Sequence, residues 1–359
     1  MRNRRSLKCL LIVIAILSLY SNTNSYGQNL ESNIDSLLLH KYPSNEPGAT
    51  FLVSKNGNII YNKAFGLANL ELNFSMQKET VFEIGSMTKQ FTAISILILM
   101  ERGVLNLDDE ITKYILDYPT NGNKITIHHL LTHTSGIKSF TSIKGINTIA
   151  KQDLTPLELI DFFKNEPVDF MPGEKFKYNN SGYVLLGYII EKVSGQNYAQ
   201  FVEEEIFKKL GMTASKYASH KDIIKNRASG YHKKDSFINN RRISFTIPYA
   251  SGSLMSNVID MFKWQEALKN NELISRKATE KAFTNYALNN GENIDYGYGW
   301  HIKQTNGISV WEHGGAIFGF KSMGVYLPNE DIYVIGLNNC DCNSPTEITR
   351  QIAQLAIGK

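Results

Sequence analysis

The N-terminal third of the chain follows apolar patterns that predict one helix, one hairpin and one buried helix. Residues 30–42 carry apolar side chains at helical spacing and predict an amphipathic helix. Residues 50–66 predict a β-hairpin, because two apolar runs flank Asn56-Gly57, a strong turn signal. Residues 87–102 are apolar on nearly all sides, which is typical of a helix inside the core.

The middle of the chain has a helical pattern, and the last third has a period of two. Thr155, Pro156 and Glu158 form a capping box with proline at the first helical position. Further helices are predicted over 183–193, 197–210 and 344–357, and strands over 299–303, 308–311, 320–327 and 332–337.

Helix and hairpin at the start, helices in the middle, and strands and a helix at the end predict an α/β fold of the α+β type. Its antiparallel β-sheet is built from both ends of the chain and flanked by N- and C-terminal helices. A mainly α-helical region is inserted between them. We expect a sheet subdomain of about 28–110 plus 240–359 and a helical subdomain of about 111–239.

Residues 1–27 have the pattern of a secretory signal peptide. A basic start is followed by the apolar run Cys9–Tyr20, which is short for a membrane span, and by a small-x-small pattern at 25–27. We expect cleavage before Gln28 and export to the periplasm or the extracellular space; an uncleaved anchor is the alternative. We expect the protein to contact a membrane only through that signal segment.

Removing the signal also changes the charge balance. Residues 1–27 hold four basic and no acidic residues, so the mature chain has 34 basic and 34 acidic residues. This balance gives nucleic-acid binding no electrostatic support. Cys340 and Cys342 alone remain, too close together to staple a fold, and we interpret them as free thiols or a local redox feature.

One of three Ser-x-x-Lys matches lies in a context suited to catalysis. Ser86 opens the long buried helix, which places the Lys89 side chain one turn away on the same face. The helix N-terminus favours an alkoxide at Ser86 and an uncharged Lys89. The alternative for Ser86 is a simple helix cap.

Two further boxes carry polar or glycine-rich chemistry. Tyr178 and Asn180 lie on a loop before a helix, where a tyrosine beside a lysine can relay protons and an amide can hold a substrate amide. The alternative is that Tyr178 packs and Asn180 caps the helix. In His313-Gly314-Gly315-Ala316 the glycines allow a backbone to approach a ligand closely; a turn between two strands is the alternative.

The three boxes, in this order and at this spacing, resemble the class C β-lactamase and D,D-peptidase type of serine hydrolase. Linking phrases resemble that family too, among them Ile84–Gln90, His129–Gly136 and Asn180–Tyr183. The likeness runs from about Pro47 to Asn338. It implies a β-lactamase/transpeptidase-like fold over residues 28–359.

The resemblance implies a role for each matching position. Ser86 would be the acylated nucleophile, Lys89 and Tyr178 the general-base and proton-relay pair, and Asn180 the residue that orients the substrate amide. The backbone N–H groups of Ser86 and Ala316 would form the oxyanion hole. His313, with Gly314 and Gly315, would bind substrate in place of the lysine that the family usually has there.

This departure from Lys-Thr/Ser-Gly removes a hydroxyl and leaves His313 as the expected cation. We therefore expect a carboxypeptidase or esterase before an efficient β-lactamase. The expected reaction is acyl transfer from a small peptide, ester or β-lactam substrate, by a monomer without cofactors. The alternative is a catalytically weak protein that binds cell-wall peptides.

A metal site is a third reading of the same chain. His128, His129 and His133 are close in sequence, but Leu130 stands where a zinc-protease helix has glutamate. We expect no metal there. No nucleotide-binding glycine fingerprint follows a predicted strand.

Overall fold

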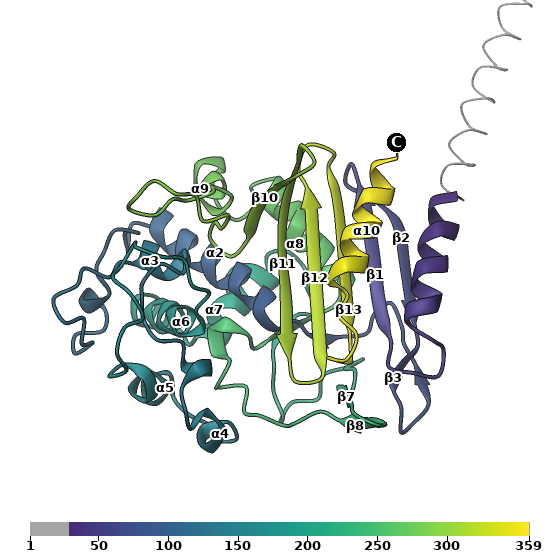
Figure 1. Ribbon diagram of the computed structural model, residues 1–359, viewed down its shortest axis with the longest axis horizontal. Coiled ribbons are helices and arrows are strands. Elements are labelled where there is room, and N and C mark those ends of the chain that lie inside the picture. The colour runs from purple at the N-terminus through teal and green to yellow at the C-terminus, as the bar shows by residue number, and fades with distance from the viewer. Residues whose placement is uncertain (1–28, 359) are drawn as a thin grey trace, which may run out of the picture.

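A computed structural model describes residues 29–358, and a six-stranded antiparallel sheet forms its centre (Figure 1). The strand order is β10-β11-β12-β13-β1-β2, so both ends of the chain meet in one sheet. The strands are β1 (Ala49–Lys55), β2 (Asn58–Phe65), β10 (His301–Thr305), β11 (Ile308–Ile317), β12 (Phe320–Leu327) and β13 (Ile332–Asn338). The fold class expected from the sequence is confirmed.

The period of two in the strands distributes side chains between two hydrophobic cores. Phe51 and Val53 of β1 face one core with the helix over residues 29–41 and α10 (Thr346–Ile357). Leu52 faces the other core, on the side of α2 (Thr88–Glu101) and α8 (Val258–Lys269). The sheet is therefore covered on both faces, as its continuous apolar strands require.

The helical region packs around α2 and lies beside the sheet, to its left in Figure 1. Its α-helices are α3 (Ile127–Leu131), α4 (Ile146–Ile149), α5 (Pro156–Phe163), α6 (Asn180–Ser194) and α7 (Tyr198–Val202), with α9 (Arg276–Ala282) later in the chain. The 3-10 turns are η1 (Gly85–Met87), η2 (Ile111–Lys113), η3 (Phe140–Ser142) and η5 (Tyr249–Ser251), and η4 (Glu203–Phe207) is a π turn. The short strands are β3 (Leu67–Asn69), β4 (Phe74–Ser75), β5 (Phe82–Glu83), β6 (Lys216–Tyr217), β7 (Tyr231–Lys233), β8 (Phe237–Asn239) and β9 (Leu254–Ser256).

Three differences in extent from the sequence prediction bear on the site and the helical region around it. α6 begins at Asn180 rather than at residue 183, because the side chain of Asn179 accepts a bond from the Gly182 N–H at 3.0 Å and caps the helix. The helix expected over 197–210 gives way to the π turn η4 after α7. β11 continues past residue 311 to Ile317, so its glycines lie inside a strand and not in a turn.

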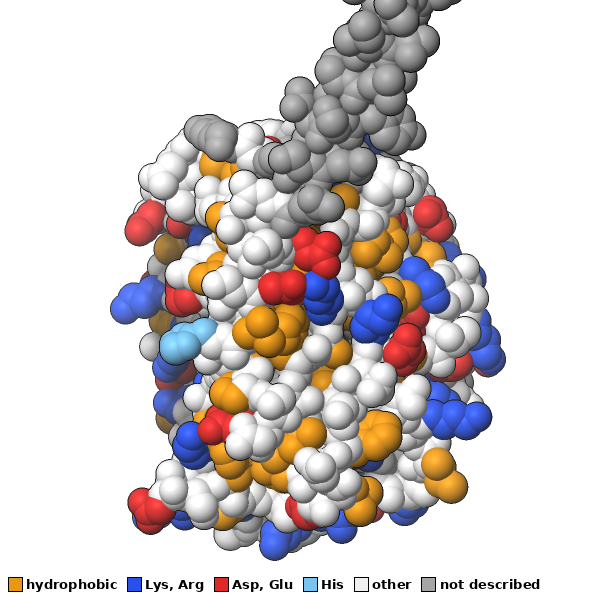
Figure 2. Space-filling model, turned by 90° about the vertical axis from the view of Figure 1, so that its right-hand side faces the viewer, with side chains coloured by type: hydrophobic (Ala, Val, Ile, Leu, Met, Phe, Trp, Pro, Cys, Tyr) orange, Lys and Arg blue, Asp and Glu red, His pale blue; other side chains and the backbone are white. Residues whose placement is uncertain are grey.

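The edge strand β2 is tied to the helix over residues 29–41 by polar contacts. Lys63 Nζ lies 2.6 Å from Glu31 and 2.5 Å from Asp35, and the Tyr61 hydroxyl donates to Asp35 at 2.7 Å. On this side of the molecule apolar, basic and acidic side chains are interspersed (Figure 2). A lysine on an edge strand disfavours pairing with another chain.

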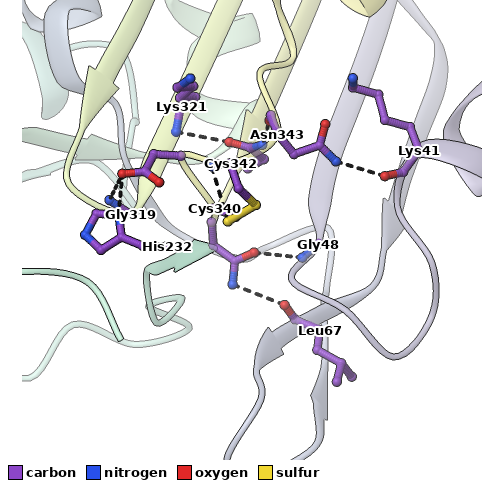
Figure 3. The surroundings of a disulfide bond; sticks show 12 residues. Lys41, Gly48, Leu67, His232, Gly319, Lys321, Cys340, Cys342 and Asn343 are labelled. Carbon is purple, nitrogen blue, oxygen red and sulfur yellow. Dashed lines mark hydrogen bonds and ion pairs between the residues drawn. A yellow bond between two sulfur atoms is a disulfide. The ribbon is translucent and has the colours of Figure 1, made fainter. Parts of the chain in front are cut away.

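The corner after β13 joins the two ends of the chain (Figure 3). Cys340 and Cys342 form a disulfide there, which corrects the reading of free thiols. Asn339 has no exposed surface; its side-chain oxygen accepts from Gly48 N–H at 2.7 Å and its amide donates to Leu67 O at 3.1 Å. The disulfide spans two positions in sequence, so it shapes the corner locally while Asn339 makes the long-range contacts.

The predicted signal segment lies outside the described residues. Within residues 29–358, helices with the length and apolar character of a membrane span are absent.

The corner generates a prediction about stability. Asn339→Ala should lower the free energy of unfolding by about 3 kcal/mol, because it leaves buried N–H and C=O groups without partners. Urea titration followed by circular dichroism measures this. Asn343→Ala, which removes a single part-buried bond to Lys41 O in the same corner, is the matched control and should cost less than about 1.5 kcal/mol. Equal losses for both variants would contradict the assignment.

Candidate active site

Ser86 lies in the 3-10 turn η1, directly before α2, and not in the first turn of the α-helix itself. The turn is fixed by its glycine: Gly85 has φ +52°, and a Cβ there would stand 2.8 Å from Ala316 N. Only glycine fits this approach without strain. The serine hydroxyl is thereby held at the wall of a cavity, beside the backbone of β11.

Lys89 is the buried centre of the site. Its side chain has no exposed surface, and its Nζ lies 2.8 Å from Asn180 Oδ1, 2.8 Å from the Ser251 carbonyl and 3.3 Å from Ser86 Oγ. None of the carboxylates in residues 29–358 forms an ion pair with it. Burial lowers the pKa of Lys89 well below its ordinary value, which favours a neutral amine.

The three neighbours of Lys89 fit the neutral amine. A neutral amine has two N–H donors and one lone pair, while Asn180 Oδ1 and the Ser251 carbonyl are acceptors only. If these two receive the N–H bonds, the lone pair is left to face Ser86 Oγ. The geometry is therefore that of a base aimed at the serine hydroxyl.

Tyr178 lies against the same lysine. Lys89 Nζ is 4.8 Å from the centre of the Tyr178 ring, and the Tyr178 hydroxyl is 3.5 Å from His313 Nε2. Burial raises the pKa of Tyr178, and a hydrogen bond with Ser86 offsets only part of that effect. The resting tyrosine is therefore a neutral phenol, better suited to donate a proton than to accept one.

Asn180 is the first residue of α6, and its side chain bridges Lys89 and Thr141. Its Oδ1 accepts from Lys89, and its Nδ2 donates to Thr141 Oγ1 at 3.3 Å on the exposed side. The alternative that Asn180 caps the helix is wrong, because Asn179 does so. The exposed amide nitrogen borders the cavity, where a substrate carbonyl can reach it.

The glycine box brings β11 against the turn that holds Ser86. A Cβ at Gly315 would lie 2.0 Å from the Ile84 carbonyl, and Ser322 Oγ donates to that carbonyl at 2.8 Å. β11 pairs with β10 only up to Glu312, so residues 313–317 pair with β12 alone. This free edge carries the Ala316 amide to the rim of the cavity beside Ser86.

His313 is not the cation that the sequence led us to expect. Its ring is buried, and burial lowers its pKa well below the ordinary value, with His301 and Lys89 lowering it further. Its Nδ1 lies 2.6 Å from the Gly314 carbonyl, which can only accept, so the proton is on Nδ1. Nε2 is then an acceptor for the hydroxyls of Tyr296 at 3.2 Å and Tyr178 at 3.5 Å.

The cavity in front of Ser86 has a volume of ≈ 690 Å³ and is mainly apolar. Its apolar lining consists of Phe140, Ile146, Ala150, Ile243, Ile247, Pro248, Ile317 and Phe318. Lys321 and Asp341 also line it, and Asp341 pairs with His232. One ammonium and one carboxylate give the cavity no net charge.

The structure thus brings all the residues named from the three boxes to one place. Sequence reasoning missed the cavity walls and the Ser251 carbonyl, because these residues come from loops, short helical turns and a strand end that are far apart in the sequence. The run of small residues at 250–253 is the local sign of a close backbone approach.

The other motif matches lie apart from this centre or are tied into the protein. Lys138 of another Ser-x-x-Lys match pairs with Asp169 at 2.7 Å. His128 bonds the Tyr298 hydroxyl at 2.8 Å, and His129 accepts from Thr126 N–H at 3.2 Å. Residues 29–358 contain no cluster of three side chains arranged to hold a metal.

Comparison with known proteins shows the same family that the three boxes resemble. A family model described as Beta-lactamase matches residues 39–357. Penicillin-binding protein 4* of Bacillus subtilis (strain 168) is 30% identical over 328 residues, which cover 87% of this chain and 72% of that protein.

Two solved structures show the same fold. An octameric penicillin-binding protein homologue from Pyrococcus abyssi has a TM-score of 0.80 and 32% identity, over 91% of this chain and 77% of that chain. A D-amino acid amidase from Ochrobactrum anthropi SV3 has a TM-score of 0.78 over 91% of this chain and 97% of that chain. Its 24% identity supports the shared fold alone.

The neutral state of Lys89 predicts the pH dependence of the reaction. If Lys89 is the base, activity requires its uncharged amine, so kcat/KM should fall as the pH drops through the Lys89 pKa, which lies below the ordinary value of about 10.4. Lys89→Arg, which stays protonated, should lose activity by about 10²–10⁴-fold at every pH. Initial rates from acidic to alkaline pH test both points. Substantial activity in Lys89→Arg would contradict the role of base.

Proposed function

This chain belongs to the β-lactamase family, and one of its relatives is a penicillin-binding protein. On this basis we propose that it is an exported serine hydrolase that forms an acyl-enzyme on Ser86. The substrate we propose is an amide or ester of the D-amino-acid peptide or ester class. The observation that carries the proposal is the position of the buried Lys89 amine. Two acceptors, Asn180 Oδ1 and the Ser251 carbonyl, can take its N–H bonds, and its third contact is with Ser86 Oγ.

In the first step Lys89 takes the proton of Ser86 while Oγ attacks the substrate carbonyl. The carbonyl oxygen becomes an oxyanion, and the donors we propose for it are the backbone N–H groups of Ser86 and Ala316, two residues that line the cavity. One such donor typically contributes about 3–4 kcal/mol to transition-state stabilisation.

Collapse of the tetrahedral intermediate breaks the bond to the leaving group. The leaving oxygen or nitrogen takes a proton from Tyr178, and the proton held by Lys89, whose Nζ lies 4.8 Å from the centre of the Tyr178 ring, replaces it. Water then attacks the acyl-enzyme ester while Lys89 takes its proton, and Lys89 passes that proton to Ser86 Oγ as the ester bond breaks, which restores the resting groups.

The cavity favours an apolar acyl group over an anionic one. Its walls are mainly aliphatic and aromatic, and its charged residues balance each other. His313, neutral and hydrogen-bonded to tyrosines, replaces the cation that binds a substrate carboxylate in β-lactamases of this type. We therefore propose a peptidase or esterase rather than an efficient β-lactamase.

The proposal also covers where the protein is located and whether it assembles into an oligomer. The signal pattern of residues 1–27 supports export to the periplasm or the extracellular space. A monomer remains a prediction; the homologue from Pyrococcus abyssi is octameric.

Replacing the nucleophile tests the proposal. The mature protein should hydrolyse a p-nitrophenyl ester, and Ser86→Ala should remove that activity by about 10⁴-fold or more. Ser75→Ala is the matched control, because Ser75 belongs to another Ser-x-x-Lys match on an exposed two-residue strand. Equal rates for the parent and Ser86→Ala would overturn the proposal.

Covalent labelling separates the enzyme from a weak binder of cell-wall peptides. A fluorophosphonate probe should add one adduct to the parent protein, seen by intact mass, and none to Ser86→Ala. Esters, D-Ala-D-Ala peptides and β-lactams compared in the same way rank the acyl donors. Binding of a peptide without any adduct or turnover would favour the alternative.

The apolar wall predicts a preference for longer acyl chains. Phe318→Ser should lower kcat/KM for a p-nitrophenyl hexanoate by about tenfold, because a large part of one aromatic contact is lost. The p-nitrophenyl acetate rate should change less than about twofold, since its acyl group is too short to need that wall. Phe318 is 39% exposed, so the fold should tolerate the change. An equal loss for both esters would contradict the position of the acyl group.

A further inference from the structure

His133 follows α3 and is buried, with 1% of its surface exposed. Two features of this residue are costly. Its φ is +60°, in the left-handed region that histidine occupies rarely. Its Nε2 has no hydrogen-bond partner among residues 29–358. Features of this kind persist where the surrounding structure depends on the residue.

His133 is hydrogen-bonded to the residue before Tyr178 and to the residue after it. Its carbonyl accepts from Lys177 N–H at 3.1 Å, and its Nδ1 accepts from Asn179 N–H at 3.1 Å. Its ring lies 4.4 Å from the ring of Tyr178 itself. One residue therefore contacts the backbone before Tyr178, the backbone after it and the side chain between them.

The hydrogen bond to Nδ1 fixes the tautomer of the His133 ring. Because Nδ1 accepts a bond, the proton is on Nε2. The ring centre lies 5.1 Å from that of Tyr183 and 4.8 Å from that of Tyr296. Burial lowers the pKa of His133 well below its ordinary value, and the nearby Lys89, His313 and His301 lower it further. The ring therefore stays neutral and does not exchange protons with the reacting groups.

We propose that His133 is the positioning residue of Tyr178: it fixes the 177–179 backbone and the phenol ring so that the hydroxyl stays beside Ser86 and His313. This inference rests on the proposed hydrolytic function and adds a residue to it. His133 touches neither substrate nor Ser86, so it acts through Tyr178 alone.

The variant that tests this is His133→Asn. Asparagine tolerates a positive φ and keeps an acceptor near the position of Nδ1, but it removes the ring that supports Tyr178. With an alkyl ester, kcat should fall about 100-fold, because a misplacement of about 1 Å can have that effect. KM should stay within about twofold, since the apolar acyl site is untouched.

His129→Asn is the matched control. His129 lies in α3, the short helix that His133 follows, and it also accepts a backbone bond at Nδ1, from Thr126. Within residues 29–358 it makes no hydrogen bond or aromatic contact with the 177–179 segment. It should leave kcat and KM at the parent values. Circular dichroism and thermal unfolding define a temperature at which both variants are folded, and the rates are compared at that temperature. If His133→Asn does not fold, His133→Gly, which also fits the positive φ, replaces it.

The leaving group distinguishes positioning from general damage. A nitrophenolate departs without a proton, so His133→Asn should lower kcat less than about fivefold with p-nitrophenyl esters. Tyr178→Phe should show the same dependence on the leaving group, and adding His133→Asn to it should cause no further loss. Equal losses with both esters, or a full additional loss in the double variant, would overturn the inference.

Ser86→Ala keeps the two claims separate. If Ser86→Ala remains active, the proposed function itself is wrong. If it is inactive while His133→Asn behaves like His129→Asn, the hydrolase stands and the positioning role of His133 is wrong.

Discussion

The site depends on one constraint: a lysine amine is buried without a counter-charge. A buried ammonium would need a carboxylate or would give up its proton, and the described residues supply only neutral acceptors around Lys89. Those acceptors come from α6 and from the turn η5, while Lys89 and Ser86 come from α2 and η1. Packing these four elements together is therefore what creates the base, and the burial of α2 on nearly all sides is what excludes water from it.

The rest of the site consists of neutral groups that share this environment. Burial raises the pKa of Tyr178 and lowers those of His133 and His313, so phenol and imidazoles remain uncharged beside the neutral amine. Such a site is suited to transferring protons between neutral groups. His313 is neutral and the walls of the cavity are mainly apolar. Both features favour neutral acyl groups over anionic ones.

The sequence predicted the sheet and the reactive residues because both leave local patterns. Strands of period two, the Thr155 capping box and the three boxes at family spacing are visible without a structure. The sequence could not show that β11 runs on through Gly315, since glycines read as a turn until the Ile84 carbonyl is seen 2.0 Å from the missing Cβ. It also could not place the Ser251 carbonyl or show that burial neutralises His313, because both depend on contacts between distant segments.

The most direct test is the charge on the Lys89 amine in the resting protein. NMR of protein labelled at the lysine ε-carbon, with Lys89 assigned by its absence in Lys89→Arg, follows that amine through a pH titration. The account predicts that Lys89 titrates well below the about 10.4 of a free lysine and separately from the surface lysines. Titration of Lys89 together with the surface lysines, near that free value, would contradict it.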